Sequence, residues 1–208
     1  MIALGGAIGT GLFLGSKFAI SFAGPSVILS YAIGGLIAVL LMGALSEMTV
    51  AHATTGSFGA FAEHYINPFA GFMIKYLYWS CIVLAVGTEV TAVGDYMQMW
   101  FPAVPPIVWV LGFSALLIGV NMFNVKAFGT LEYWFSATKV FAIVAFILVA
   151  AVLIFGGTNP DFGFHNYQAE GGFFMGGAKG VWFAVILAIF SYLSIEMIAV
   201  AAGEAKDP

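Results

Sequence analysis

Long apolar stretches, separated by short clusters of glycine, proline and charged residues, make up most of the chain. Three stretches contain no charged residue: Phe18 to Ser46 is 29 residues long, Tyr96 to Val125 is 30 and Val140 to Pro160 is 21. A helix needs about 20 apolar residues to cross a hydrocarbon core of about 30 Å. The pattern therefore predicts an all-α membrane protein that crosses the bilayer several times.

Each span must be helical because lipid offers no partner for free backbone N–H and C=O groups. The predicted spans are residues 2–22, 26–46, 72–99, 106–122, 135–155 and 181–202. Between the second and third spans, residues 51–71 carry aromatic side chains at helical spacing, which predicts a short amphipathic helix at the membrane surface. Residues 156–177 are rich in glycine and predict an exposed loop.

Composition excludes a soluble protein and narrows the function. The chain is 62% hydrophobic and 8% charged, against about 25% charged residues in an ordinary soluble domain. A net charge of −4 without any basic run argues against nucleic acid as a partner. No zinc-binding His-Glu-x-x-His helix and no Gly-x-Ser-x-Gly nucleophile motif occurs, so we predict no enzyme activity, no metal and no organic cofactor.

The first predicted span contains four glycines within seven positions, between Gly5 and Gly11. Each glycine inside a helix costs about 1 kcal/mol relative to alanine. One explanation is close packing against another helix through small residues. The other is a helix broken near the middle of the membrane, where freed N–H groups hold a carboxylate and freed carbonyls hold an ammonium group. Those are the two charged ends of an α-amino acid.

Three ionisable residues lie inside predicted spans: Glu89, Lys139 and Glu196. Such residues cost about 2.5–3.5 kcal/mol each on insertion scales at the membrane centre. Lys139 lies near the start of its span, so its side chain could instead extend to the interface. Glu89 is too deep for that, and a Glu89–Lys139 pair would be able to take up and release a proton. Glu196 follows a serine- and tyrosine-containing stretch, whose hydroxyls can satisfy freed backbone groups.

Five groups of motifs follow one another along the chain: Met1 to Ser16, Ala23-Gly24-Pro25-Ser26, Gly56-Ser57-Phe58, Val125 to Gly129 with Glu132 to Phe135, and Ala202 to Pro208. In sequence and order they resemble the motifs of bacterial amino acid permeases of the amino acid–polyamine–organocation superfamily. The resemblance covers essentially the whole chain.

The resemblance implies a LeuT-like fold, in which two inverted repeats of five spans follow one another. Residues 1–208 would then supply the first repeat and the first span of the second, incomplete at both ends. It also implies a multi-pass protein of the cytoplasmic (plasma) membrane with a cytoplasmic amino terminus. The expected partners are the lipid bilayer, a free amino acid and the missing C-terminal half, in the same or another chain.

The same resemblance implies a substrate site where the first and sixth spans unwind. The residues implied are Ala7, Gly9, Thr10 and Gly11 in the first span and Phe190, Tyr192, Leu193 and Ser194 in the sixth. Thr10 and Gly11 would bind the carboxylate. The carbonyls of Ala7, Phe190 and Leu193 would bind the ammonium. Relatives often have glycine where this chain has Leu193-Ser194, so the second break is expected to differ in shape.

For energy coupling, the resemblance places Lys139 where sodium-coupled relatives bind their ion. It matches Glu196 to a glutamate with a proposed gating or protonation role. We therefore predict proton-coupled, secondary active uptake of L-amino acids, with Lys139, Glu89 and Glu196 as the coupling residues and sodium as the less favoured ion.

Two alternatives remain open at this stage. A truncated permease fragment would insert into the membrane but not transport by itself, because alternating access needs both repeats. An aquaporin-like channel is suggested by Asn67-Pro68 and Asn159-Pro160, but Phe69 and Asp161 replace the usual alanines. The chain also has no arginine to form the filter of such a channel.

Overall fold

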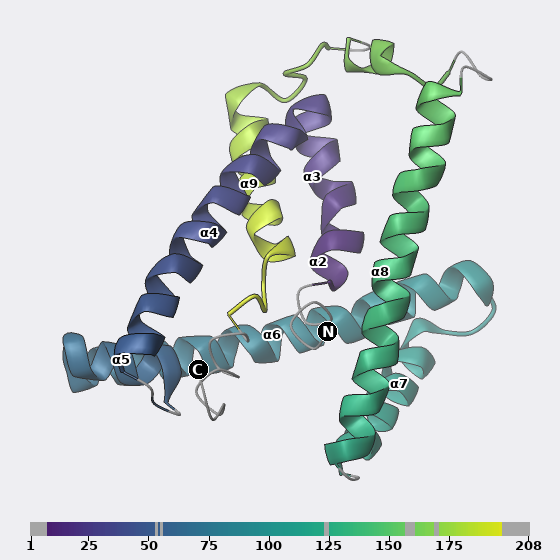
Figure 1. Ribbon diagram of the computed structural model, residues 1–208. Coiled ribbons are helices and arrows are strands. Elements are labelled where there is room, and N and C mark those ends of the chain that lie inside the picture. Colours follow the sequence, from purple (N-terminus) through teal and green to yellow (C-terminus); the bar gives the residue numbers. More distant parts are fainter. Residues whose placement is uncertain are drawn as a thin grey trace. The chain divides into compact units, whose positions relative to one another are not determined.

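The computed structural model describes residues 8–52, 54, 56–122, 125–156, 161–168 and 171–196. Over these residues the chain is helical and forms no strand. The elements are α2 (Thr10–Phe13), α3 (Gly15–Ala23), the 3-10 turn η1 (Gly24–Ser26), α4 (Val27–Ala51), α5 (Ser57–Tyr65), α6 (Pro68–Trp100), α7 (Pro106–Met122), α8 (Val125–Phe155), the 3-10 turn η2 (Phe164–Tyr167) and α9 (Gly177–Ser191) (Figure 1).

Helices occur in all six predicted apolar segments, but their limits differ from the prediction. Only α7 matches its predicted segment at both ends. Helix α8 begins at Val125, ten residues before the predicted start, and α9 ends at Ser191 instead of continuing to residue 202. The first segment is interrupted between α2 and α3. Both interruptions lie next to residues predicted to bind substrate.

Three segments are long and apolar enough to cross a membrane in the described part of the chain: Thr10–Ala51, Pro68–Trp100 and Tyr133–Phe155. The first of these contains η1, where Gly24 has φ +58° and the chain reverses its direction between α3 and α4 (Figure 1). Helices α7 and α9 are also apolar but shorter, with 17 and 15 residues. The protein is therefore an all-helical, multi-pass membrane protein.

Large apolar side chains point outward along these segments. Leu40, Leu84 and Phe146 are 65%, 72% and 73% exposed. In water such a surface would be unfavourable by about 25 cal/mol per Å² of apolar area. The exposed side chains are suited to lipid or to further protein.

The chain divides into two units, and each is described by itself. The first unit comprises Met1–Ala38 and Gly129–Ser194, and the second comprises Val39–Phe128 and Ile195–Pro208.

Small residues hold α3 against α9 in the first unit, where the two helices run side by side (Figure 1). Ala19, Ala23 and Ala184 are fully buried between them. Gly180 faces the backbone carbonyl of Phe22, and a side chain there would collide with it. This is the close packing through small residues that stabilises helix pairs in membranes.

Alanine at position 180 is expected to destabilise the protein, because its methyl group would meet the Phe22 carbonyl. Overpacking of this kind costs about 1–3 kcal/mol, which lowers the melting temperature by roughly 2–10 °C for a chain of this size. Thermal unfolding in detergent measures the effect. Gly87→Ala is the matched control, because a Cβ there meets nothing within 4 Å and alanine favours a helix. A Gly180→Ala variant as stable as Gly87→Ala would contradict this packing.

In the second unit, α5 packs on the first turns of α6. The side chain of Asn67 accepts a hydrogen bond from the Ala70 N–H at 2.8 Å, and Pro68 occupies the first helical position, which is a favourable start for a helix. Lys75 on α6 forms an ion pair of 2.9 Å with Glu63 on α5. The short helix predicted between the second and third spans is confirmed as α5, and its location at the membrane surface stays a prediction.

Candidate functional site

In the first apolar segment, the described helix begins within the group of glycines. Gly9 is extended, with φ −134° and ψ −160°, and the helical turn α2 begins at Thr10. After Phe13 the helix lapses only at Leu14, which keeps right-handed helical angles and donates its N–H to the Thr10 carbonyl, and α3 begins at Gly15. Residues 1–7 lie outside the described residues, so a helix broken near the middle of the membrane stays a prediction.

A second interruption follows α9. After Ser191 the chain turns through residues 192–196. Within this turn Ser194 has φ +77°, a left-handed conformation that costs a non-glycine residue about 1–2 kcal/mol. This explains in physical terms why a glycine would be favoured here, and why the serine is a notable departure.

The two interruptions meet inside the first unit. A Cβ on Gly11 would lie 2.5 Å from the carbonyl oxygen of Phe190 and 3.0 Å from the Cα of Ser191. The Ser191 hydroxyl donates a hydrogen bond of 2.6 Å to the carbonyl of Gly11. Gly11 therefore allows the close packing that one explanation for the first-span glycines predicts, and the unwound helix of the other explanation stays a prediction.

Thr10 has a buried hydroxyl group beside the contact between Gly11 and Phe190. Its Oγ1 atom is buried and has no hydrogen-bond partner among the residues that the structure describes. A buried hydroxyl without a partner costs about 1–3 kcal/mol in mutational data. The Thr10 hydroxyl is therefore able to bind a polar group of a ligand at the point where the helix starts.

The structure brings most of the predicted substrate residues into one region. Gly9, Thr10, Gly11, Phe190, Tyr192, Leu193 and Ser194 all belong to the first unit, at or beside the two interruptions. The Phe190 carbonyl, predicted to bind ammonium, already accepts the N–H groups of Tyr192 and Leu193 within the turn. Ala7, also predicted to bind ammonium, lies outside the described residues.

Tyr192 supports the break from the side of α4. Its hydroxyl donates a hydrogen bond of 3.1 Å to the backbone carbonyl of Tyr31. Gly35 leaves room for it, because a Cβ there would lie 3.0 Å from the Tyr192 hydroxyl oxygen. Ser191 and Tyr192 thus both donate side-chain hydrogen bonds to backbone carbonyls, Ser191 to Gly11 beside the break and Tyr192 to Tyr31 within α4.

The predicted coupling residues lie in different settings. Lys139 is half-buried near the middle of α8, in the first unit. Glu89 is exposed on α6, in the second unit. Since each unit is described by itself, the pairing of Glu89 with Lys139 stays a prediction.

Glu196 has a partner that sequence reasoning missed. The hydroxyl of Tyr78 on α6 donates a hydrogen bond of 3.3 Å to its carboxylate, within the second unit. The ring of Phe58 on α5 packs edge-on against the Tyr78 ring, with centroids 4.6 Å apart. A tyrosine in an apolar helix gives only a weak signal, because its partner depends on how distant segments fold together.

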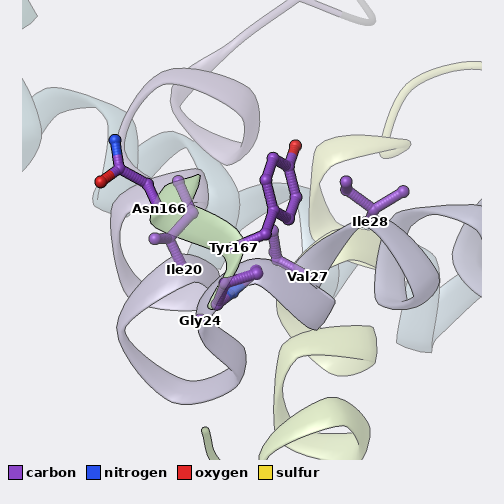
Figure 2. Close-up of a pocket in the computed structure, with 7 residues that line it drawn as sticks. Ile20, Gly24, Val27, Ile28, Asn166 and Tyr167 are labelled. Carbon is purple, nitrogen blue, oxygen red and sulfur yellow. The ribbon is translucent and has the colours of Figure 1, made fainter. Parts of the chain in front are cut away.

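A hollow of about 310 Å³ lies at the other end of α3 from Thr10 (Figure 2). Its lining residues are Ile20, Gly24, Pro25, Val27, Ile28, Asn166 and Tyr167. Figure 2 shows Asn166 and Tyr167 beside the apolar side chains of Ile20, Val27 and Ile28. None of the predicted site residues lines this hollow, so it is separate from the junction of the two interruptions.

Comparisons with known proteins agree on one family. The family model described as "Amino acid permease" matches residues 1–208. The "Uncharacterized amino acid permease YtnA" of Bacillus subtilis is 43% identical over the whole chain. The "Aromatic amino acid transport protein AroP" of Escherichia coli is 44% identical, and the "Probable threonine/serine transporter YbxG" of Bacillus subtilis is 42% identical, again over the whole chain.

The chain spans about half the length of these curated relatives, 46% in each case. No solved structure gives a significant match to it.

Proposed function

Because the chain belongs to the amino acid permease family, we propose that it forms the N-terminal half of a secondary active transporter that takes up L-amino acids across the cytoplasmic membrane. The second half would come from the same or another chain, since the relatives are about twice as long. A membrane enzyme and a channel are both less consistent with this family.

The proposed architecture is six spans, arranged as the first repeat and the first span of the second repeat of a LeuT-like transporter, with a cytoplasmic amino terminus. The order of the helices supports this arrangement, with α7, α8 and α9 following the long helices α4 and α6. Further support comes from the interruptions, which lie in the first and the last of the six apolar segments. Broken helices near the membrane centre are typical binding sites in transporters with inverted repeats.

The observation that carries the proposal is the buried Thr10 hydroxyl, which has no hydrogen-bond partner in the part of the chain that the structure describes. We assign the substrate carboxylate to this hydroxyl and to the N–H groups of Thr10 and Gly11 at the start of α2. The freed N–H groups and the dipole at such a break favour a negative charge. The substrate ammonium would bind the opposing carbonyls of Ala7, Phe190 and Leu193.

The side chains assigned to the pocket are uncharged, which favours a neutral amino acid. Two relatives fit this assignment by name, one as an aromatic amino acid transport protein and one as a probable threonine/serine transporter. Phe190 would form one wall of the pocket. Leu193 would narrow the pocket, because it has a branched side chain at a position in the turn where relatives often have glycine.

Lys139 is proposed to take and release the coupling proton, in the place of a sodium ion. Its position in the apolar segment Tyr133–Phe155 supports this role, because ionisable residues within spans are costly and usually mark ion or proton pathways. Glu196 is proposed either to act as a gate to the substrate site or to take up a proton during transport. The hydrogen bond from Tyr78 would hold the Glu196 carboxylate against α6.

Uptake into membrane vesicles tests the proposal directly. The protein, expressed from its complete reading frame, is expected to accumulate labelled neutral amino acids when the outside is acidic, and to lose the accumulation when a protonophore is added. The 208-residue chain alone is expected to transport nothing, which matches the fragment alternative. Failure of the complete protein to take up any amino acid would overturn the proposal, and uptake that requires sodium would overturn its proton coupling.

A further inference from the structure

Tyr31, on the first turns of α4, makes two hydrogen bonds with the end of α9. Its hydroxyl lies 3.1 Å from the hydroxyl of Ser191. Its backbone carbonyl accepts the 3.1 Å hydrogen bond from the hydroxyl of Tyr192. One residue of α4 therefore contacts both residues at which α9 ends and the turn begins.

The direction of the first hydrogen bond follows from counting hydrogens. A serine hydroxyl has one hydrogen, and Ser191 gives it to the carbonyl of Gly11 at 2.6 Å. Ser191 must then accept from Tyr31, whose hydroxyl is the donor. The result is a relay of three groups, from Tyr31 through Ser191 to Gly11.

This relay is buried and lies beside the contact between Gly11 and Phe190. Ser191 is only 9% exposed, and hydrogen bonds in such surroundings are stronger than in water. The carbonyl it binds belongs to Gly11, whose Cα packs against the Phe190 carbonyl. A serine side chain has three rotamers, and the hydrogen bonds to the Gly11 carbonyl and from the Tyr31 hydroxyl both favour the one that reaches Gly11.

We propose that Tyr31 is a positioning residue for the substrate site, a role that rests on the proposed function. In this role it acts through Ser191 and not directly on the substrate. By donating to Ser191 it orients the Ser191 hydrogen toward Gly11, and so sets the separation between the start of α2 and the end of α9. In this way it would hold the Thr10 hydroxyl and the residues after α9 in place for the substrate.

Tyr31→Phe isolates this role. The variant removes the donor but keeps the backbone carbonyl that binds Tyr192, and it keeps the ring that packs edge-on against Tyr192 at 6.4 Å. Ser191→Ala removes the middle of the relay. Ser30→Ala is the matched control, because the buried Ser30 hydroxyl also joins α4 to α9, at the carbonyl of Val181, but away from the break.

The experiment measures the KM and kcat of uptake and the melting temperature of the complete protein. Tyr31→Phe and Ser191→Ala are each expected to raise KM about tenfold, roughly 1.4 kcal/mol of lost binding, with kcat reduced less than threefold. The double variant should be no worse than either single one, because both remove the same relay. Ser30→Ala is expected to lower the melting temperature while KM stays within twofold of wild type.

Three outcomes would overturn the proposal and leave the proposed function intact. The first is a wild-type KM in Tyr31→Phe, and the second is a double variant whose KM shows that the effects of Tyr31→Phe and Ser191→Ala add. The third is a KM in Ser30→Ala that rises as much as in Tyr31→Phe. If Tyr31→Phe does not reach the membrane, the KM of Ser191→Ala tests the proposal instead, and a wild-type KM in that variant would overturn it. Absence of uptake by the wild-type protein would overturn both the proposed function and this role.

Discussion

Replacement of Gly11 by leucine is expected to abolish amino acid uptake by the complete protein. The smallest side chain is already too large, because an alanine Cβ would lie 2.5 Å from the Phe190 carbonyl oxygen and 2.9 Å from the carbonyl carbon. Those are backbone atoms and cannot rotate away. Overpacking costs about 1–3 kcal/mol per site, so Gly11→Ala should reduce uptake by about 10–100-fold.

Gly15→Ala is the control for this prediction, four residues later in the same interrupted segment. A Cβ on Gly15 would have its nearest neighbours at 3.8 Å and 4.0 Å, which are ordinary contacts. Uptake by Gly15→Ala is therefore expected to stay near wild type. Initial rates of labelled amino acid uptake, normalised to protein in the membrane, compare the two. Normal substrate affinity in Gly11→Leu would refute the broken-helix site.

Replacement of Lys139 by alanine is expected to uncouple uptake from the proton gradient. One elementary charge moving through 100 mV supplies about 2.3 kcal/mol, enough to accumulate a substrate about 50-fold. Without the lysine that we propose for proton coupling, accumulation should fall to about the external concentration. Exchange of amino acid between the two sides should continue, because the substrate residues are unchanged.

Lys75→Ala is the matched control for Lys139→Ala. Lys75 also lies on a long apolar helix, but its side chain is half exposed and paired with Glu63. Exposed ion pairs contribute about 0–1 kcal/mol, so this variant should retain accumulation and its dependence on external pH. Concentrative uptake that still depends on external pH in Lys139→Ala would remove Lys139 from the coupling mechanism.

Much of the helical structure follows from local properties of the sequence. Helix α7 begins and ends at the predicted residues, because Pro106 can start a helix and the apolar run ends near Met122. The limits of α8 and α9 were harder to predict. Helix α8 starts within a polar stretch that hydropathy excludes, and the apolar run after Ser191 gives no sign of a turn.

Candidate site residues were predictable to different degrees. The glycines near Thr10 are visible along the sequence as a loss of helix propensity. The residues after α9 came only from the family resemblance. Tyr31 and Tyr78 gave no signal, because each acts through a partner far along the chain: Tyr31 is 160 residues from Ser191, and Tyr78 is 118 residues from Glu196.

The sequence by itself determined the membrane environment, the helical class and the place where the first span is weakened. Those properties depend on hydropathy and backbone propensity, which are local to each segment. Only the tertiary structure decided that Gly11 packs against Phe190 and that Ser191 hydrogen-bonds to Gly11, 180 residues away. Such contacts depend on which helices pack together, because a hydrogen bond between two segments requires its donor and acceptor atoms to lie within about 3 Å of each other.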